Sequence, residues 1–285
     1  MKQARSVLVA ILSCCCLDAP AAADPLAAGA GKQIADANGM LITVFTYRPA
    51  CRDPSLLMVF HGVARNPRSY RDDARALADR HCLLLVAPLF GKRAFPVWRY
   101  QQGGIISDGV IQDPRDWTGR LVLDLVEWTR RQEGRRLSYF LLGHSAGAQF
   151  LDRLVAFVPN EAQRIVVANA GTYVRPSLEV PAPYGFGKVY SGTEGETQLR
   201  RYLAQPLTIY LGEDDTKEDD RNDDPDALAQ GVSRFERGST TFTSAKALAQ
   251  ARSWPFNWRL VELPGVGHNA RKMFSAPQAS EALAP

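Results

Sequence analysis

The chain has 285 residues, of which 46% are hydrophobic, and a formal net charge of +4. This size and apolar content suffice for one domain with a large core, and the spread of lysines and arginines along the chain argues against a nucleic-acid-binding protein. In chain order, the sequence predicts a signal peptide over residues 1–23 and a single folded domain over residues 24–285.

The N-terminus has the organisation of an export signal. Lys2 and Arg5 precede the apolar run 7–17, and small residues at 21–23 offer a cleavage site. The apolar run is too short to span a bilayer. We therefore predict an exported protein, periplasmic or secreted, with no stable membrane insertion once the signal is removed. A lipoprotein signal ending at Cys14 is the less favoured alternative.

Short apolar runs alternate with amphipathic segments along the rest of the chain. The predicted strands are 43–47, 56–60, 83–87, 138–142, 164–168, 207–211 and 258–263. The predicted helices include 70–80, 117–131, 148–157 and 244–252. This alternation predicts an α/β fold with a mainly parallel central sheet and helices on both faces.

A G-x-S-x-G motif at 143–147 lies between a predicted strand and a predicted helix. Ser145 at its centre is the candidate nucleophile. In such a tight turn the serine has a strained backbone, and the residues two before and two after it must be small, because strand and helix nearly touch there. Gly143 and Gly147 meet this requirement. The alternative is a glycine-rich turn around a buried serine without a catalytic role.

A serine hydroxyl needs a general base, and the base needs an acid that orients it. The chain has four histidines. His268 is the candidate base, because it lies in a glycine-containing loop after a predicted strand, where its side chain can turn back over the sheet edge. Asp214 and Asp215 follow another predicted strand and compete for the role of the acid. Charge and burial do not separate them at the level of the sequence.

An oxyanion hole would complete such a site. One donor is expected from the amide of Ala146, directly after the nucleophile, and a second from the loop after the strand 56–60. Residues 61–64 in that loop resemble the His-Gly segment that carries the second donor in lipases and esterases. We assign this donor to the amide of Val63, with Gly62 and Ala64 as alternatives.

Together these motifs resemble the α/β-hydrolase superfamily from about residue 41 to residue 273. The segments that look like secreted bacterial polyhydroxyalkanoate depolymerases and feruloyl esterases are 61–66, 143–149, 168–171 and 264–269. The resemblance implies the α/β-hydrolase fold and a serine hydrolase that uses neither a metal nor an organic cofactor.

The resemblance also bears on individual residues. In related sequences the acid stands three residues after a glycine that ends a strand, which favours Asp215 over Asp214. The chain order is then nucleophile, acid, base, as in α/β-hydrolases. Removal of the signal peptide leaves two cysteines, Cys51 and Cys82. The strands they adjoin are neighbours in the resembling fold, so a disulfide is expected in an oxidising compartment, with two buried thiols as the alternative.

Aromatic residues follow two of the predicted strands on the expected active-site edge. The candidates to line an acyl or aryl pocket are Trp98, Tyr100, Trp117, Tyr173 and Tyr184. The long segment 172–205 contains prolines and glycines and is a candidate lid.

The sequence thus predicts a serine hydrolase that cleaves a small or polymeric carboxylic ester through an acyl-enzyme intermediate. Two alternatives stay open. One is an oligopeptidase-type serine peptidase with the same chemistry on a peptide. The other is a catalytically inactive binding protein on the hydrolase fold, against which the complete set of triad candidates argues.

Overall fold

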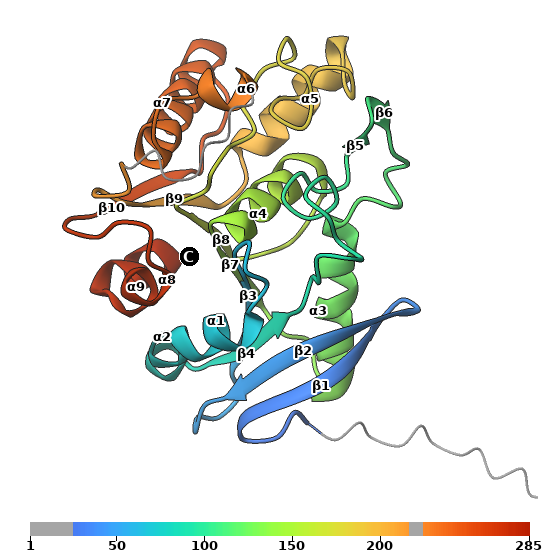
Figure 1. The fold of residues 1–285 in the computed structure, drawn as a ribbon, viewed down its shortest axis with the longest axis vertical. Helices are drawn as coiled ribbons and strands as arrows, with labels where there is room; N and C mark the ends of the chain where they lie inside the picture. The colour runs from blue at the N-terminus through green and yellow to red at the C-terminus, as the bar shows by residue number, and fades with distance from the viewer. Residues whose placement is uncertain (1–24, 217–224) are drawn as a thin grey trace, which may run out of the picture.

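The computed structural model of the chain describes residues 25–216 and 225–285. Its centre is an eight-stranded sheet with the strand order β1-β2-β4-β3-β7-β8-β9-β10 (Figure 1). The pairings of β1 with β2 and of β2 with β4 are antiparallel, and the other five are parallel. The strands are β1 (Gly29–Ala37), β2 (Met40–Arg48), β3 (Ser55–Phe60), β4 (Leu83–Pro88), β7 (Tyr139–His144), β8 (Arg164–Ala168), β9 (Leu207–Gly212) and β10 (Arg259–Leu263), beside a small hairpin of β5 (Ile106–Ser107) and β6 (Val110–Ile111).

Helices cover both faces of the sheet, as Figure 1 shows. One apolar cluster packs α3, α4, α5 and α7 against one face, and a second packs α1, α2, α8 and α9 against the other. The helices are α1 (Pro67–Asp73), α2 (Arg75–His81), α3 (Gly119–Glu133), α4 (Ala146–Phe157), α5 (Gly192–Leu203), α6 (Pro225–Leu228), α7 (Arg234–Arg252), α8 (Ala270–Ser275) and α9 (Pro277–Leu283). The predicted fold class, a mainly parallel sheet between two helical layers, is confirmed.

Alternating side chains of the central strands explain this layering. In β3, Leu56, Met58 and Phe60 belong to the first cluster, whereas Leu57 and Val59 belong to the second. A strand buried on both faces is therefore largely apolar, which is the pattern that the sequence showed for the central parallel strands such as β3.

The elements that the sequence did not predict lack such a pattern. Strand β1 lies at the edge of the sheet, and every second residue over most of its length is exposed. The predicted helix 70–80 is two helices, separated at Ala74. Helix α7 begins ten residues before the predicted helix 244–252. The sequence pattern missed its first half because that half carries mainly polar residues.

Strand ends in the parallel part of the sheet are level with one another. Phe60 at the end of β3 pairs with Gly143 of β7, and His144 of β7 pairs with Ala168 of β8. In an open α/β sheet, ligands bind outside the carboxyl ends of the strands. The loops after β3, β7, β9 and β10 meet at this edge and carry the candidate site residues.

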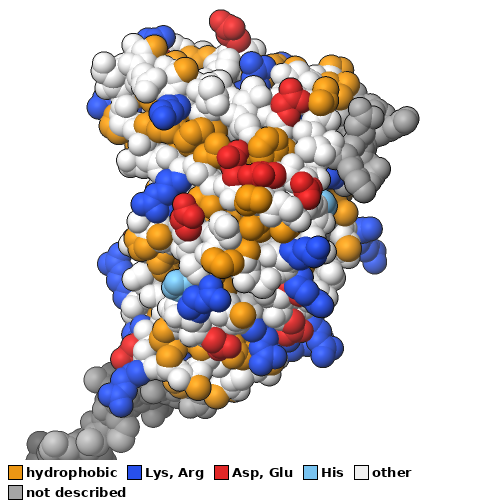
Figure 2. All heavy atoms as spheres, turned by 90° about the vertical axis from the view of Figure 1, so that its left-hand side faces the viewer, with side chains coloured by type: hydrophobic (Ala, Val, Ile, Leu, Met, Phe, Trp, Pro, Cys, Tyr) orange, Lys and Arg blue, Asp and Glu red, His pale blue; other side chains and the backbone are white. Residues whose placement is uncertain are grey.

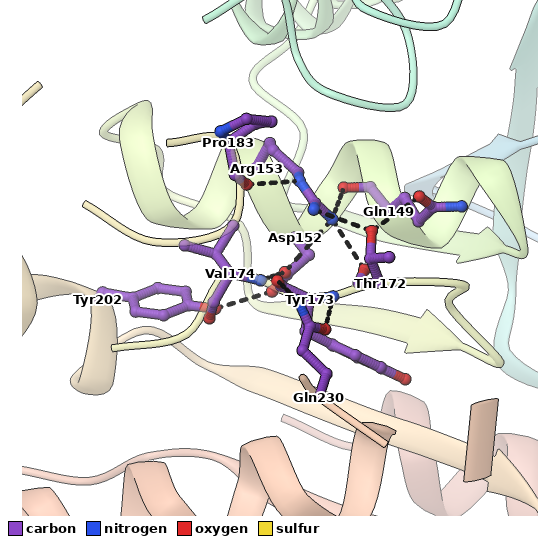
Figure 3. A network of polar contacts seen from close by, with 9 residues as sticks. All are labelled: Gln149, Asp152, Arg153, Thr172, Tyr173, Val174, Pro183, Tyr202 and Gln230. Carbon is purple, nitrogen blue, oxygen red and sulfur yellow. Dashed lines mark hydrogen bonds and ion pairs between the residues drawn. The ribbon is translucent and has the colours of Figure 1, made fainter. Parts of the chain in front are cut away.

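A buried polar network holds the segment between β8 and α5, which the sequence suggested as a lid (Figure 3). Arg153 of α4 donates to the carbonyls of Thr172 and Pro183 at 2.8 and 3.1 Å, and the carboxylate of Asp152 accepts from the amide of Val174 at 2.5 Å. Both α4 side chains are fully buried. These contacts anchor residues 172–183 in the core, and a lid formed by the whole segment 172–205 stays a prediction.

Cys51 and Cys82 form a disulfide with a sequence separation of 31 residues. It joins the loop before β3 to the start of β4. In the loop-entropy description, a closed loop of this length stabilises the folded state by about 3–4 kcal/mol.

We therefore expect reduction of the purified protein to lower its free energy of unfolding by about 3–4 kcal/mol and to lower its melting temperature. Thermal unfolding with and without reductant measures the change. The matched control is the double variant Cys51→Ala/Cys82→Ala, whose melting temperature should already be low and should not respond to reductant. Equal melting temperatures for reduced and oxidised wild type would contradict the expected stabilisation.

On the face drawn in Figure 2, basic and acidic side chains are interspersed among apolar ones, and neither sign covers it. None of the helices in the described part of the chain is both long and apolar enough to cross a membrane.

Candidate active site

Ser145 lies in the turn between β7 and α4, with φ 59° and ψ −120°. This combination of a positive φ and a negative ψ is strained for a residue with a side chain. A Cβ on Gly143 would lie 2.4 Å from the carbonyl oxygen of Gly147, and a Cβ on Gly147 would lie 2.3 Å from that of Phe60. Both glycines are therefore required by the close approach of strand and helix. The turn has the geometry expected of a nucleophile elbow.

The structure brings Ser145, His268 and Asp215 into one hydrogen-bonded line. Nε2 of His268 lies 3.0 Å from Oγ of Ser145, and Nδ1 lies 2.7 Å from Oδ2 of Asp215. A carboxylate only accepts, so Nδ1 carries the proton and Nε2 can accept from the serine hydroxyl. Asp215 is 2% exposed, whereas Asp214 is exposed. Of the two competing aspartates, Asp215 is the one in contact with the histidine.

Asn169 joins the loops that carry the acid and the histidine. It follows β8 with φ 47°, its Oδ1 accepts from the amide of Gly212 at 2.8 Å, and its Nδ2 donates to the carbonyl of Gly267 at 3.3 Å. A Cβ on Gly212 would lie 2.2 Å from the carbonyl oxygen of Val266. The two loops are thus in backbone contact, with Asn169 beneath them. No motif in the sequence predicts this role for Asn169, although an asparagine at a strand end is suited to a positive φ.

The oxyanion loop, residues 61–64, is held from behind by the ring of His61. The amide of Phe90 donates to Nε2 of His61 at 3.1 Å, so Nδ1 carries the proton and donates to the carbonyl of Gly62 at 3.0 Å. The amide of Arg65 donates to the same carbonyl at 3.1 Å. In a trans peptide the N–H is directed opposite to the C=O, so the amide of Val63 is directed away from His61. Val63 borders the same cavity as Ser145.

Ala146 is the first residue of α4, where backbone amides have no acceptor within the helix. The positive end of the helix dipole lies there, next to Ser145. The amides assigned as oxyanion donors thus come from a helix N-terminus and from the loop after β3, the two sources that the motif requires.

A second histidine packs against the first. The rings of His144 and His268 are 4.6 Å apart at an interplanar angle of 37°, and the hydroxyl of Tyr70 lies 3.2 Å from Nδ1 of His144. Burial, and then the neighbouring His268, lower the pKa of His144 well below 6.5. His144 is therefore a neutral packing partner behind the base.

Three buried groups give the folded state a defined response to acid. Burial lowers the pKa of His61 to about 4 and raises the pKa of Asp152 to about 6, besides its effect on His144. As the pH falls below 6.5, both histidines bind protons in the unfolded chain but not in the folded state. Each histidine therefore lowers the free energy of unfolding by up to about 1.4 kcal/mol per pH unit. Asp152 has the opposite sign below pH 6, because its folded form takes up the proton first.

The destabilising effect of acid at the two histidines is larger than its stabilising effect at Asp152. We therefore expect these groups together to lower the free energy of unfolding as the pH falls from 7 to 5. Urea unfolding with the disulfide intact measures this trend. Nuclear magnetic resonance tests the cause directly: the ring C–H signals of His61 and His144 should not move between pH 8 and pH 5. A titration of either signal near pH 6.5 would contradict the burial argument.

A cavity of about 390 Å³ opens above the serine. Its walls include Val63, Tyr70, Asp73, Ser145, His268 and Arg271. At its rim, Nε of the exposed Arg271 lies 2.9 Å from Oδ1 of Asp73. Across the described residues, no group of three or more histidine, cysteine, aspartate or glutamate side chains is placed to hold a metal ion.

None of the five aromatic residues predicted to line the pocket borders this cavity. Tyr100, Trp117, Tyr173 and Tyr184 are buried, and Trp98 is half-buried. Tyr100, for example, lies behind the oxyanion loop and donates to the carbonyl of His61 at 2.9 Å. The rings of Tyr100, Trp117 and Tyr173 belong to the apolar cluster on one face of the sheet.

No protein-family model matches the chain, and no curated protein matches it. Solved structures do. LpqC, a poly(3-hydroxybutyrate) depolymerase from Bordetella parapertussis, is 34% identical with a TM-score of 0.80, and the match covers 87% of this chain and 88% of LpqC. Poly(aspartic acid) hydrolase-1 from Sphingomonas sp. KT-1 is 29% identical with a TM-score of 0.83, over 90% of this chain and 99% of that one.

A more distant likeness concerns the fold alone. The siderophore hydrolase EstB from Aspergillus nidulans is 15% identical with a TM-score of 0.51, over 89% of this chain and 96% of EstB. The sheet, the elbow and the matched structures together define a serine hydrolase of the α/β fold. Within that class, the chain belongs to the α/β-hydrolase family that includes the Bordetella LpqC depolymerase.

Proposed function

We propose that the protein hydrolyses carboxylic esters through an acyl-enzyme formed on Ser145. The observation that carries the proposal is the unbroken line from Oγ of Ser145 through both ring nitrogens of His268 to Asp215, with bonds of 3.0 and 2.7 Å, at the floor of an open cavity. This arrangement supplies a nucleophile, a general base and an orienting acid in hydrogen-bond contact.

The chemistry proceeds in two halves. Oγ of Ser145 attacks the ester carbonyl as Nε2 of His268 accepts its proton, and the amides of Val63 and Ala146 bind the oxyanion of the tetrahedral intermediate. His268 then returns the proton to the departing alcohol. Water, deprotonated by the same histidine, then attacks the acyl-enzyme. As the bond between the acyl carbon and Oγ breaks, His268 returns the proton to Oγ of Ser145 and the acid is released. Asp215 holds the imidazole in the tautomer that both halves need.

Substrate preference is tested by hydrolysis rates across 4-nitrophenyl esters of increasing acyl length, beside a polyester film and a feruloyl ester. Hydrolysis of poly(3-hydroxybutyrate) film would show that this protein shares the depolymerase activity for which LpqC is named. Amide cleavage is the second candidate, favoured by the likeness to poly(aspartic acid) hydrolase-1. Release of peptides from poly(aspartic acid) or from oligopeptides, faster than from any ester, would replace the ester assignment.

Export is part of the proposal. The leader at residues 1–23 lies outside the described residues, and support comes from its sequence and from the disulfide between Cys51 and Cys82, a bond typical of oxidising compartments. The mature chain is then the catalytic domain from residue 24 onwards. Mass spectrometry of protein from the periplasm or medium should find an N-terminus near residue 24. Full-length chain confined to the cytoplasm would contradict export.

A further inference from the structure

Arg234, which no sequence motif singles out, contacts the acid of the proposed triad. Its Nη1 lies 3.2 Å from Oδ1 of Asp215, and the two side chains are 9% and 2% exposed. The other carboxylate oxygen, Oδ2, is the one in contact with His268. One buried carboxylate therefore joins a guanidinium to the imidazole.

The start of α7 is built so that Arg234 reaches this position. Ser233 caps the helix by accepting from the amide of Glu236 at 3.1 Å, and the amide of Phe235 donates to the backbone carbonyl of Asp215 at 3.3 Å. The helix N-terminus is thus fixed to the loop after β9 through the main chain. Its first side chain, Arg234, then meets the carboxylate on the oxygen that does not contact the histidine.

The contact between Arg234 and Asp215 has two physical effects on the carboxylate. A carboxylate taken out of water is costly unless it is paired with a charge and with hydrogen-bond donors. It can also rotate about its Cβ–Cγ bond, which would turn its oxygens away from the imidazole. A guanidinium on Oδ1 satisfies the first need and restricts the rotation, so that Oδ2 stays directed at Nδ1 of His268.

We infer that Arg234 is a positioning residue of the active site: it orients the carboxylate of Asp215, and through it the imidazole of His268. The inference rests on the proposed function. Arg234 does not border the cavity above Ser145. Its removal should therefore lower kcat and leave KM for a small ester almost unchanged.

The experiment is a double-mutant cycle on hydrolysis of 4-nitrophenyl acetate. Arg234→Met is measured in the wild type and in Asp215→Asn, with kcat and KM determined for each. In the wild type we expect kcat to fall roughly 10- to 100-fold, the range of couplings within one polar network, with KM within about twofold. In Asp215→Asn the second substitution should cost less than about twofold, because the group through which Arg234 acts is already lost. Arg234→Lys, which keeps the charge, should recover part of kcat.

Arg237→Met is the matched control. Arg237 is a buried arginine on the same helix, and it donates to the backbone carbonyls of Gly231 and Gly171 at 2.8 and 2.7 Å. Its replacement should lower stability, with a kcat effect that is the same in wild type and in Asp215→Asn. If Arg234→Met does not fold, as judged by circular dichroism, Arg234→Gln takes its place in the cycle.

Two results would overturn the inference about Arg234 alone: a wild-type kcat for a folded Arg234→Met, or an equal loss in both backgrounds. Two other results would contradict the proposed function itself. If purified wild type did not hydrolyse the ester, or if Ser145→Ala hydrolysed it as fast, the reaction would not use this site, and the role of Arg234 would fall with it.

Discussion

Replacement of Ser145 by alanine is expected to abolish ester hydrolysis and to leave the fold intact. Only the oxygen that attacks the carbonyl is lost, from a residue that is 7% exposed. Loss of a triad nucleophile leaves the catalysis that the oxyanion hole and substrate binding supply, roughly 10³- to 10⁴-fold over water, which is several orders of magnitude below an intact triad.

Steady-state hydrolysis of 4-nitrophenyl esters measures this loss, and circular dichroism with thermal unfolding serves as the control for folding. A purified, folded Ser145→Ala that kept more than a few per cent of wild-type turnover would show that another group is the nucleophile. The elbow would then be a structural turn with a strained serine.

The second large effect separates the adjacent aspartates of the acid loop. Asp215→Asn should lower turnover by about 10³- to 10⁴-fold, since an amide in place of the carboxylate leaves the imidazole in the wrong tautomer. Asp214→Asn should cost less than about tenfold, because its side chain is exposed and Asp215 is the one in contact with His268. The two replacements are isosteric, which makes Asp214→Asn the matched control.

Turnover of the two variants on the same ester, compared at equal folded fraction, decides between the aspartates. The reverse ranking would move the acid to Asp214. Two mild effects would exclude both residues, and Glu213 would be the next carboxylate to test.

The elbow was predictable because its motif stands between a predicted strand and a predicted helix. The contact that requires Gly143 is made within the turn, with the carbonyl oxygen of Gly147, whereas the contact that requires Gly147 is made with the carbonyl oxygen of Phe60 in β3. The parallel strands were predictable for a different reason. The central ones are buried on both faces, so the short apolar run 56–60 matches most of the observed strand β3.

Features that depend on tertiary packing were not predictable in this way. The edge strand β1 has no apolar run, so only its pairing with β2 defines it. Aromatic residues such as Tyr100 and Tyr173 stand near strand ends, but the sequence does not say whether their rings point toward the cavity or the core. Arg234 meets Asp215 only because α7 docks on the loop after β9.

Covalent labelling with a fluorophosphonate tests the central claim most directly, because this reagent reacts with a serine that a neighbouring base has activated. Intact-mass spectrometry of the wild type should show the addition of one phosphonyl group, peptide mapping should locate it on Ser145, and Ser145→Ala should remain unmodified under the same conditions. A wild type that acquires no label, or a label on a residue other than Ser145, would contradict the account of this site as an active serine hydrolase centre.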